Sequence, residues 1–309
     1  MKSNQFVKFK NINSSLFKIL KDIEKQNSFF HQKEIPELKK FMLECKTILD
    51  TKKDIRALII CLYPKNQNYA KFSAHTVKKI LEIMSDYAGD TLVQNASKEK
   101  LIEVYDRDRK LSMHKGSRYH QTREGGSIHT DNVNIPTGWE YLMFGCLSSS
   151  KAGGETILVD SKIIHRHLNS NFIEAKKILE QNFYWEKRGV ADELYKAPIL
   201  TYDKKKQPMF RYLRPYLEAA HVKANKKLTS KQLYALDVLD ALLETSKFQF
   251  RYKMQKGDIL FNLDSKVLHG RTSFSDAYNA LPLSKIKNNE SRLKRTMIRV
   301  WIKNRNKKN

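Results

Sequence analysis

Cysteine, proline and glycine are scarce in this chain, which has 3, 7 and 11 of them among 309 residues. So little glycine and proline excludes a collagen-like or low-complexity protein. The three cysteines are Cys45, Cys61 and Cys146, and they form no C-x-x-C pair. This argues against a disulfide-rich fold and against a zinc–thiolate site. Their odd number indicates a reducing compartment, and we expect a cytoplasmic protein.

Long apolar segments are missing as well. No apolar run approaches the roughly 20 residues that a membrane span needs. Residues 57–63 form a short apolar run that is typical of a buried strand. The first ten residues alternate lysine with polar and aromatic residues, unlike a secretory signal. We therefore expect no membrane partner.

Acidic residues are in the minority, because 58 Lys and Arg face 33 Asp and Glu, a formal net charge of +25. Such a field attracts nucleic acid, acidic proteins, membrane surfaces and small carboxylates or phosphates. The basic residues are spread along the chain, without an Arg-Gly repeat or an aromatic–basic ribonucleoprotein motif. A nucleic-acid partner is therefore not favoured, and a charge that serves only solubility is the alternative.

The chain is expected to form one domain, residues 1–309, in which hydrophobic periodicity distinguishes a helical region from a strand-rich region. Apolar residues recur at helical spacing through residues 1–105, as in Leu16, Leu20 and Ile23, which predicts a mainly helical region. Residues 106–302 contain many short apolar or alternating runs that predict strands. A helix with a capping box at Thr229 is predicted at about 229–246. The expected fold is mainly β, a sandwich or barrel with helical decoration.

Two histidines and one aspartate could bind a metal ion. His129 and Asp131 are two residues apart, so on a strand they would share a face. His269 follows an apolar pair and precedes a glycine. Two histidines and a carboxylate are the ligands of a mononuclear non-haem Fe(II) site, although zinc binds the same residue types. Taken singly, each motif is more typical of a surface or core polar group.

Two further segments could bind anions. Arg295 and Arg299 share parity in a predicted strand, and arginine binds carboxylates through two parallel hydrogen bonds. Salt bridges to Asp or Glu are the alternative for this pair. Gly153-Gly154 stands before Thr156 and by itself indicates only a tight turn.

The order of these four segments resembles one family. The H-T-D segment of His129 and Asp131, the G-G-E-T segment ending in Thr156, the H-G-R-T segment of His269 and the R-x-x-x-R segment of Arg295 follow one another. Over about residues 110–302 the chain is similar to the taurine dioxygenase and clavaminate-synthase-like group of Fe(II)/2-oxoglutarate-dependent dioxygenases. The resemblance implies a double-stranded β-helix, or jelly-roll, core.

The resemblance also implies a role for each motif residue. His129, Asp131 and His269 match the iron ligands. Thr156 and Arg295 match positions that bind the distal carboxylate of 2-oxoglutarate, and Arg299 matches a position that reaches the prime substrate. One spacing departs from the family, because His269 and Arg295 are 26 residues apart. The extra residues, about 275–291, are polar and indicate a loop insertion, which leaves Arg271 and Arg292 as competitors for the role of Arg295.

The expected function is therefore an Fe(II)-, 2-oxoglutarate- and O2-dependent oxygenase. It would oxidise, by default hydroxylate, an unactivated C–H bond of a small anionic or zwitterionic molecule such as an amino acid. Three alternatives stay open: an oxygenase acting on a substrate tethered to an acidic carrier protein, a nucleic-acid-associated jelly-roll binding protein, and a hydrolytic zinc enzyme. The carboxylate of Asp131 disfavours halogenation, because related halogenases lack that ligand.

Overall fold

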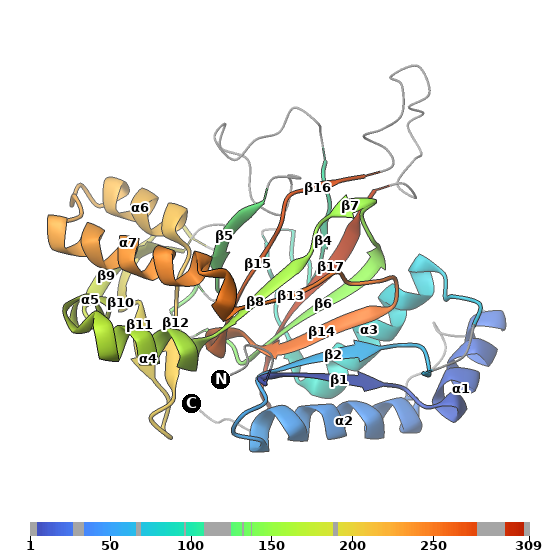
Figure 1. Ribbon diagram of the computed structural model, residues 1–309. Coiled ribbons are helices and arrows are strands. Elements are labelled where there is room, and N and C mark those ends of the chain that lie inside the picture. The colour runs from blue at the N-terminus through green and yellow to red at the C-terminus, as the bar shows by residue number, and fades with distance from the viewer. Residues whose placement is uncertain are drawn as a thin grey trace.

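Two β-sheets face each other in the computed structural model, and helices cover the outer face of each sheet (Figure 1). The structure describes residues 5–26, 34–65, 69–95, 97–107, 125–131, 133–136, 138–187, 191–276 and 294–305. Most of the insertion expected at 275–291, and Arg292 with it, lies outside the described residues.

Seven strands form the larger sheet, in the order β1-β2-β14-β6-β17-β3, with β4 also paired to β17. They are β1 (Val7–Asn11), β2 (Ala57–Cys61), β3 (Asp90–Thr91), β4 (Leu101–Val104), β6 (Tyr141–Ser148), β14 (Asp258–Leu263) and β17 (Thr296–Lys303). Strands β1 and β2 are parallel, and the other pairs are antiparallel. The apolar run predicted at 57–63 supplies β2, whose residues are apolar on both sides because both faces of this sheet are covered.

Four strands form the smaller sheet, in the order β13-β8-β15-β5, and all of its pairs are antiparallel. They are β5 (Gly126–His129), β8 (Thr156–Asp160), β13 (Gln249–Tyr252) and β15 (Val267–Arg271). Three two-stranded pairs complete the strands: β7 (Ala152–Gly153) with β16 (Phe274–Ser275), β9 (Asn182–Glu186) with β10 (Leu194–Pro198), and β11 (Leu200–Tyr202) with β12 (Pro208–Phe210).

Three N-terminal helices, α1 (Ser14–Lys25), α2 (Pro36–Thr51) and α3 (Ala74–Ala88), pack on the outer face of the larger sheet. Asn13 and Ser73 cap α1 and α3 with their side chains, which accept hydrogen bonds from backbone N–H groups of the first turn. The apolar stripe predicted around Leu16 and Leu20 is buried against residues of β6, β14 and β17 in one cluster. The N-terminal hundred residues thus supply three helices and also strands β1 to β3.

Four helices cover the outer face of the smaller sheet: α4 (Ser161–Asn171), α5 (Ile173–Leu179), α6 (Arg214–Lys223) and α7 (Ser230–Glu244). The capping box predicted at Thr229 is present, because Thr229 and Gln232 bind each other's backbone N–H groups. Leu236 and Leu239 of α7 pack in one cluster with Val159 and Leu268 of the sheet.

A third apolar cluster joins the inner faces of the two sheets. Ile59, Leu260 and Met297 of the larger sheet pack with Leu158 and Val267 of the smaller one. Because side chains alternate along a strand, every second residue of β15 and β17 points into this interlayer, and the others point toward the helices. The inner positions near one end of the interlayer are polar and form the site described below.

The protein has a mixed α/β structure, in which the strands expected from the sequence are accompanied by seven α-helices within the described residues. The helices bury the apolar outer faces of the two sheets. None of the helices in the described ranges is long and apolar enough to span a bilayer.

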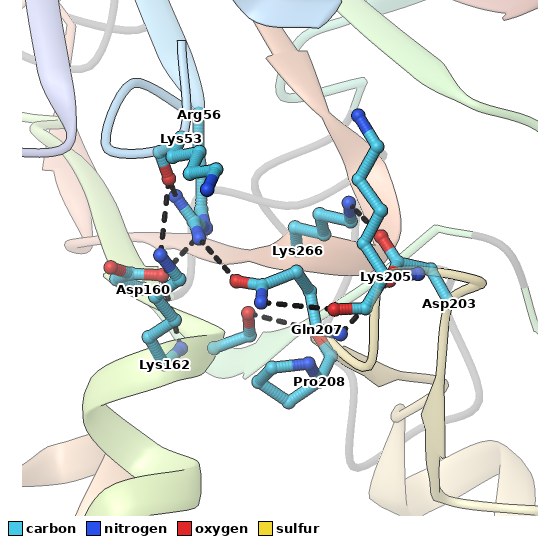
Figure 2. A network of polar contacts seen from close by, with 10 residues as sticks. Lys53, Arg56, Asp160, Lys162, Asp203, Lys205, Gln207, Pro208 and Lys266 are labelled. Atoms are coloured by element: carbon cyan, nitrogen blue, oxygen red, sulfur yellow. Dashed lines mark hydrogen bonds and ion pairs between the residues drawn. The ribbon is translucent and has the colours of Figure 1, made fainter. Parts of the chain in front are cut away.

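A polar network connects the base of the larger sheet to α4 and to the β11–β12 pair (Figure 2). The buried Arg56 guanidinium forms an ion pair with Asp160, Nε to Oδ1 3.1 Å, and donates to the carbonyl of Lys53 at 2.7 Å. Asp160 in turn caps α4 by accepting from the backbone N–H of Lys162. Burial raises the pKa of the Asp160 carboxyl, although Arg56 lowers it in part.

We predict that Arg56→Met destabilises the protein by about 3–5 kcal/mol at pH 7, because it leaves the Asp160 carboxylate buried without its cation. An acid whose pKa is raised by folding binds its proton more tightly in the folded state, so stability through this group falls as the pH rises. The loss should therefore shrink as the pH falls from 7 toward about 4. Urea unfolding at several pH values measures both effects.

The matched control is Lys177→Met, which breaks the exposed ion pair between Lys177 and Glu174. It should change the free energy of unfolding by less than about 0.5 kcal/mol. An equally small effect of Arg56→Met would contradict the importance of the network.

Candidate functional site

His129 and His269 lie opposite each other on neighbouring strands of the smaller sheet. They are register partners in the β15–β5 pair, and both side chains are buried. Their ring centroids are 4.5 Å apart. His269 has the same parity on β15 as Val267, which packs between the sheets, so the two imidazoles face the larger sheet.

Asp131 completes the group, although it stands just beyond the strand. β5 ends at His129, so the strand pleat does not place Asp131 as the sequence suggested. Hydrogen bonds place it: its backbone N–H donates to Asp264 Oδ1 at 3.2 Å. The preceding Thr130 exchanges two hydrogen bonds with the backbone of Tyr212, which fixes the turn.

The Asp131 carboxylate lies between the two sheets. The indole N–H of Trp301, on β17, donates to Oδ2 at 2.9 Å. Oδ1 lies 3.7 Å from His129 Nε2 and 4.0 Å from His269 Nε2. One ligand atom from each of the three residues lies within 4.8 Å of the other two. No other cluster of this kind, with three or more His, Cys, Asp or Glu, occurs within the described ranges.

This donor set fits a divalent transition metal. Two imidazole nitrogens and one carboxylate oxygen are the ligand types of non-haem iron and also of zinc. Burial and the neighbouring His129 lower the pKa of His269 to about 3, so its imidazole is neutral. Burial raises the pKa of Asp131, but Arg299 and the two histidines outweigh burial and hold it well below its usual range. His269 and Asp131 therefore offer the protonation states that metal binding requires.

Arg299 lies beside the carboxylate of Asp131. Its Nη1 is 3.3 Å from Asp131 Oδ1, and its Nε donates to Gln94 Oε1 at 2.8 Å. Gln94 is buried, and its side-chain amide also donates to the backbone carbonyls of Arg299 and Lys100. The guanidinium carbon lies 4.7 Å from the ring centroid of Trp301. Arg299 is thus held by two side chains that no sequence motif indicated.

Thr156 and Arg295 lie at the other end of the site. Thr156 begins β8, and Arg295 is buried immediately before β17. Gly154 has a φ of +72°, and a Cβ there would lie 3.1 Å from the Arg295 side chain. The glycines that predicted a turn therefore also leave room for this guanidinium.

One cavity brings together all six residues that the sequence nominated. It is lined by Val104, His129, Asp131, Phe144, Thr156, His269, Gly270, Arg271, Arg295, Met297 and Arg299. Arg271, which the sequence offered only as a competitor of Arg295, lines the same cavity. Val104, Phe144 and Met297 are the apolar residues that the larger sheet contributes to the cavity. From the sequence, only the alternation of side chains along their strands could have indicated that they face it.

The chain is similar to known proteins in sequence and in fold. The sequence model of the family described as "Taurine catabolism dioxygenase TauD, TfdA family" matches residues 65–301. No curated protein matches the sequence significantly. Among solved structures, asparagine oxygenase in complex with Fe(II), 2S,3S-3-hydroxyasparagine and succinate is similar at a TM-score of 0.66 and 11% identity, covering 95% of this chain and 93% of that one.

A second similar protein is the non-heme iron oxygenase OrfP. Its complex with Fe, succinate and (3S)-hydroxy-L-Arg has a TM-score of 0.64 and 11% identity, covering 96% of this chain and 94% of that one. Its complex with Fe and alpha-ketoglutaric acid has a TM-score of 0.63 and 13% identity, covering 96% and 93%. At these identities the likeness concerns the fold.

We predict that His269→Ala abolishes tight binding of one divalent transition metal ion, because it removes one of three buried ligands. Titration with Fe(II) under anaerobic conditions, or with Co(II) as a spectroscopic probe, measures the loss. The matched control is His75→Ala, on the exposed side of α3, which should bind the metal like the wild type. Metal binding of His269→Ala with unchanged affinity would refute the assignment.

A second prediction concerns the hydrogen bond between Trp301 and Asp131. Trp301→Phe keeps an aromatic ring and removes the N–H that holds Oδ2. Groups that orient a metal ligand typically contribute about 10- to 100-fold to affinity, so we expect at least a tenfold weaker metal affinity. Trp139→Phe is the control, because Trp139 stacks on Trp301 with centroids 4.0 Å apart. Equal effects of the two variants would indicate that Trp301 acts only through packing.

Proposed function

The chain belongs to the taurine catabolism dioxygenase TauD, TfdA family, and from this premise we propose that it oxidises a C–H bond of an amino acid with Fe(II), 2-oxoglutarate and O2. As a member of that family it is an Fe(II)/2-oxoglutarate-dependent oxygenase. The observation that carries the proposal is the buried His129–Asp131–His269 group in one cavity with Thr156 and Arg295.

Residues 1–309 are proposed to form one dioxygenase domain, with a jelly-roll core over residues 106–302. Two facing sheets with mostly antiparallel strands support the double-stranded β-helix. The N-terminal helices share one apolar cluster with β6, β14 and β17, which supports a single folding unit. The part expected as a helical buttress, residues 1–105, is then an integral layer of that domain.

His129, Asp131 and His269 are proposed to hold Fe(II). When bound, the iron would supply the oxidising chemistry, with 2-oxoglutarate and O2 as cosubstrates. The protein's own contribution is positional. Trp301 orients the Asp131 carboxylate, and the β15–β5 pairing orients the two imidazoles.

Thr156 and Arg295 are proposed to bind the distal carboxylate of 2-oxoglutarate. Both line the cavity that also contains His129, Asp131 and His269. A buried guanidinium that donates two hydrogen bonds is suited to a carboxylate.

The prime substrate is proposed to be an amino acid whose carboxylate meets Arg299. This guanidinium lies beside the metal-ligand carboxylate and is held by Gln94, so a substrate anion bound to it would place nearby C–H bonds close to the metal. The similar structures contain hydroxylated asparagine and hydroxylated arginine, which supports the amino-acid class. A substrate tethered to an acidic carrier protein is the second candidate, favoured by the net charge of +25.

The proposal predicts that anaerobic addition of Fe(II) and 2-oxoglutarate produces the visible charge-transfer band of an Fe(II)–2-oxo acid chelate. In air, at least one free L-amino acid should accelerate succinate release and yield one equivalent of oxidised product. The measurement is a panel of the twenty amino acids, followed by mass spectrometry of the product.

Measured at saturating Fe(II), Arg299→Met should still form the chelate band but lose the acceleration by the amino acid, because the substrate anion has lost its partner. Acceleration by no free amino acid, together with turnover on a carrier-bound substrate that falls steeply with salt, would favour the second candidate. Absence of the band from the wild type would refute the function.

A further inference from the structure

We propose that Arg271 is a second residue that binds the distal carboxylate of 2-oxoglutarate, and that Arg271 and Arg295 together select a dicarboxylate cosubstrate over a monocarboxylate. The inference rests on the proposed function and adds a specificity-determining residue to it. Arg271 lines the same cavity as the three ligands, Thr156 and Arg295.

The position of Arg271 on its strand directs it toward the cosubstrate. It lies two residues after His269 on β15, so both side chains point into the interlayer, about 7 Å apart along the strand. This separation is comparable to the length of an extended five-carbon dicarboxylate. Arg271 is also the register partner of Thr156 on β8. The strand pairing therefore places Arg271 beside the threonine at the distal end of the site.

A single aromatic ring connects the two arginines. The guanidinium carbon of Arg271 lies 4.8 Å from the ring centroid of Phe274, and that of Arg295 lies 5.3 Å from the same centroid. Phe274 is buried on β16. A cation close to an aromatic ring is attracted to it, so each of the two guanidinium groups is stabilised beside Phe274.

Arg271 and Arg295 are both buried, so each guanidinium has lost much of its hydration. A carboxylate that binds to both accepts hydrogen bonds from both. A terminal methyl group at the same place accepts none. Arg271 and Arg295 therefore discriminate between cosubstrates by the chemical group at the distal end of the cosubstrate.

His269 and Arg295 are 26 positions apart in the sequence. Arg271 is two residues from His269 on one strand, and its distance from the metal ligands is set by that strand alone. The H-G-R-T segment thus carries both a metal ligand and an anion-binding residue.

The test compares two cosubstrates that differ only at the distal end. Anaerobic protein loaded with Fe(II) is titrated with 2-oxoglutarate and with 2-oxopentanoate, in which a methyl group replaces the distal carboxylate. The charge-transfer band reports the dissociation constant of each. Arg271→Met should weaken 2-oxoglutarate at least tenfold and change 2-oxopentanoate by less than about threefold.

Two further variants complete the design. Arg271→Lys keeps the charge without the planar fork and should lose part of the preference for 2-oxoglutarate, which also covers the case in which Arg271→Met does not fold. Arg251→Met is the matched control, because Arg251 is exposed on β13 and hydrogen-bonds only Gln249 within the described residues. It should leave both dissociation constants unchanged.

Each possible outcome either supports or overturns the role of Arg271. A selective loss of 2-oxoglutarate affinity supports the inference. Equal weakening of both cosubstrates shows that Arg271 is structural, and an unchanged preference shows that it does not contact the carboxylate, so either result overturns it. A wild type without a band for either cosubstrate overturns the proposed function as well, which distinguishes the two failures.

Discussion

The buried carboxylate of Asp131 is the group on which the site depends. An anion removed from water must be compensated by charge and hydrogen bonds, and here the compensation comes from both sheets. Trp301 and Arg299 contact it from the larger sheet, while His129 and His269 face it from the smaller one. The interaction therefore fixes how the polar ends of the two inner faces meet.

The fold supports this arrangement by making the interlayer rigid. Apolar side chains from both sheets fill the space beside the site, and helices close each outer face. Packed interiors of this kind resist small displacements, so ligand positions are held by many contacts rather than by local hydrogen bonds alone. The Arg56–Asp160 ion pair is a second contact that holds separate elements together, because it joins the start of β2 to the start of α4.

Charge inside the cavity is divided between its two ends. Arg271 and Arg295 share the ring of Phe274 near Thr156, and Arg299 lies next to Asp131. Positive charge thus occurs at two places in the cavity that His129, Asp131 and His269 also line. The net charge of +25 is a different property, because it belongs mainly to the surface and acts on encounter over distances limited by salt.

The sequence by itself determined the family and the enzyme class, because the four motifs follow one another in order along the chain. It also predicted strand β2 from a short apolar run and nominated six of the residues that line the cavity. Sequence patterns did not show that Asp131 lies beyond its strand and is placed by hydrogen bonds, nor the contact of Arg299 with Gln94, 205 residues away. They also left Arg271 as an alternative to Arg295, although in the structure both guanidinium groups lie beside the ring of Phe274. These features were decided only by tertiary structure, because they depend on side chains that meet across two sheets, and no local pattern encodes such a meeting.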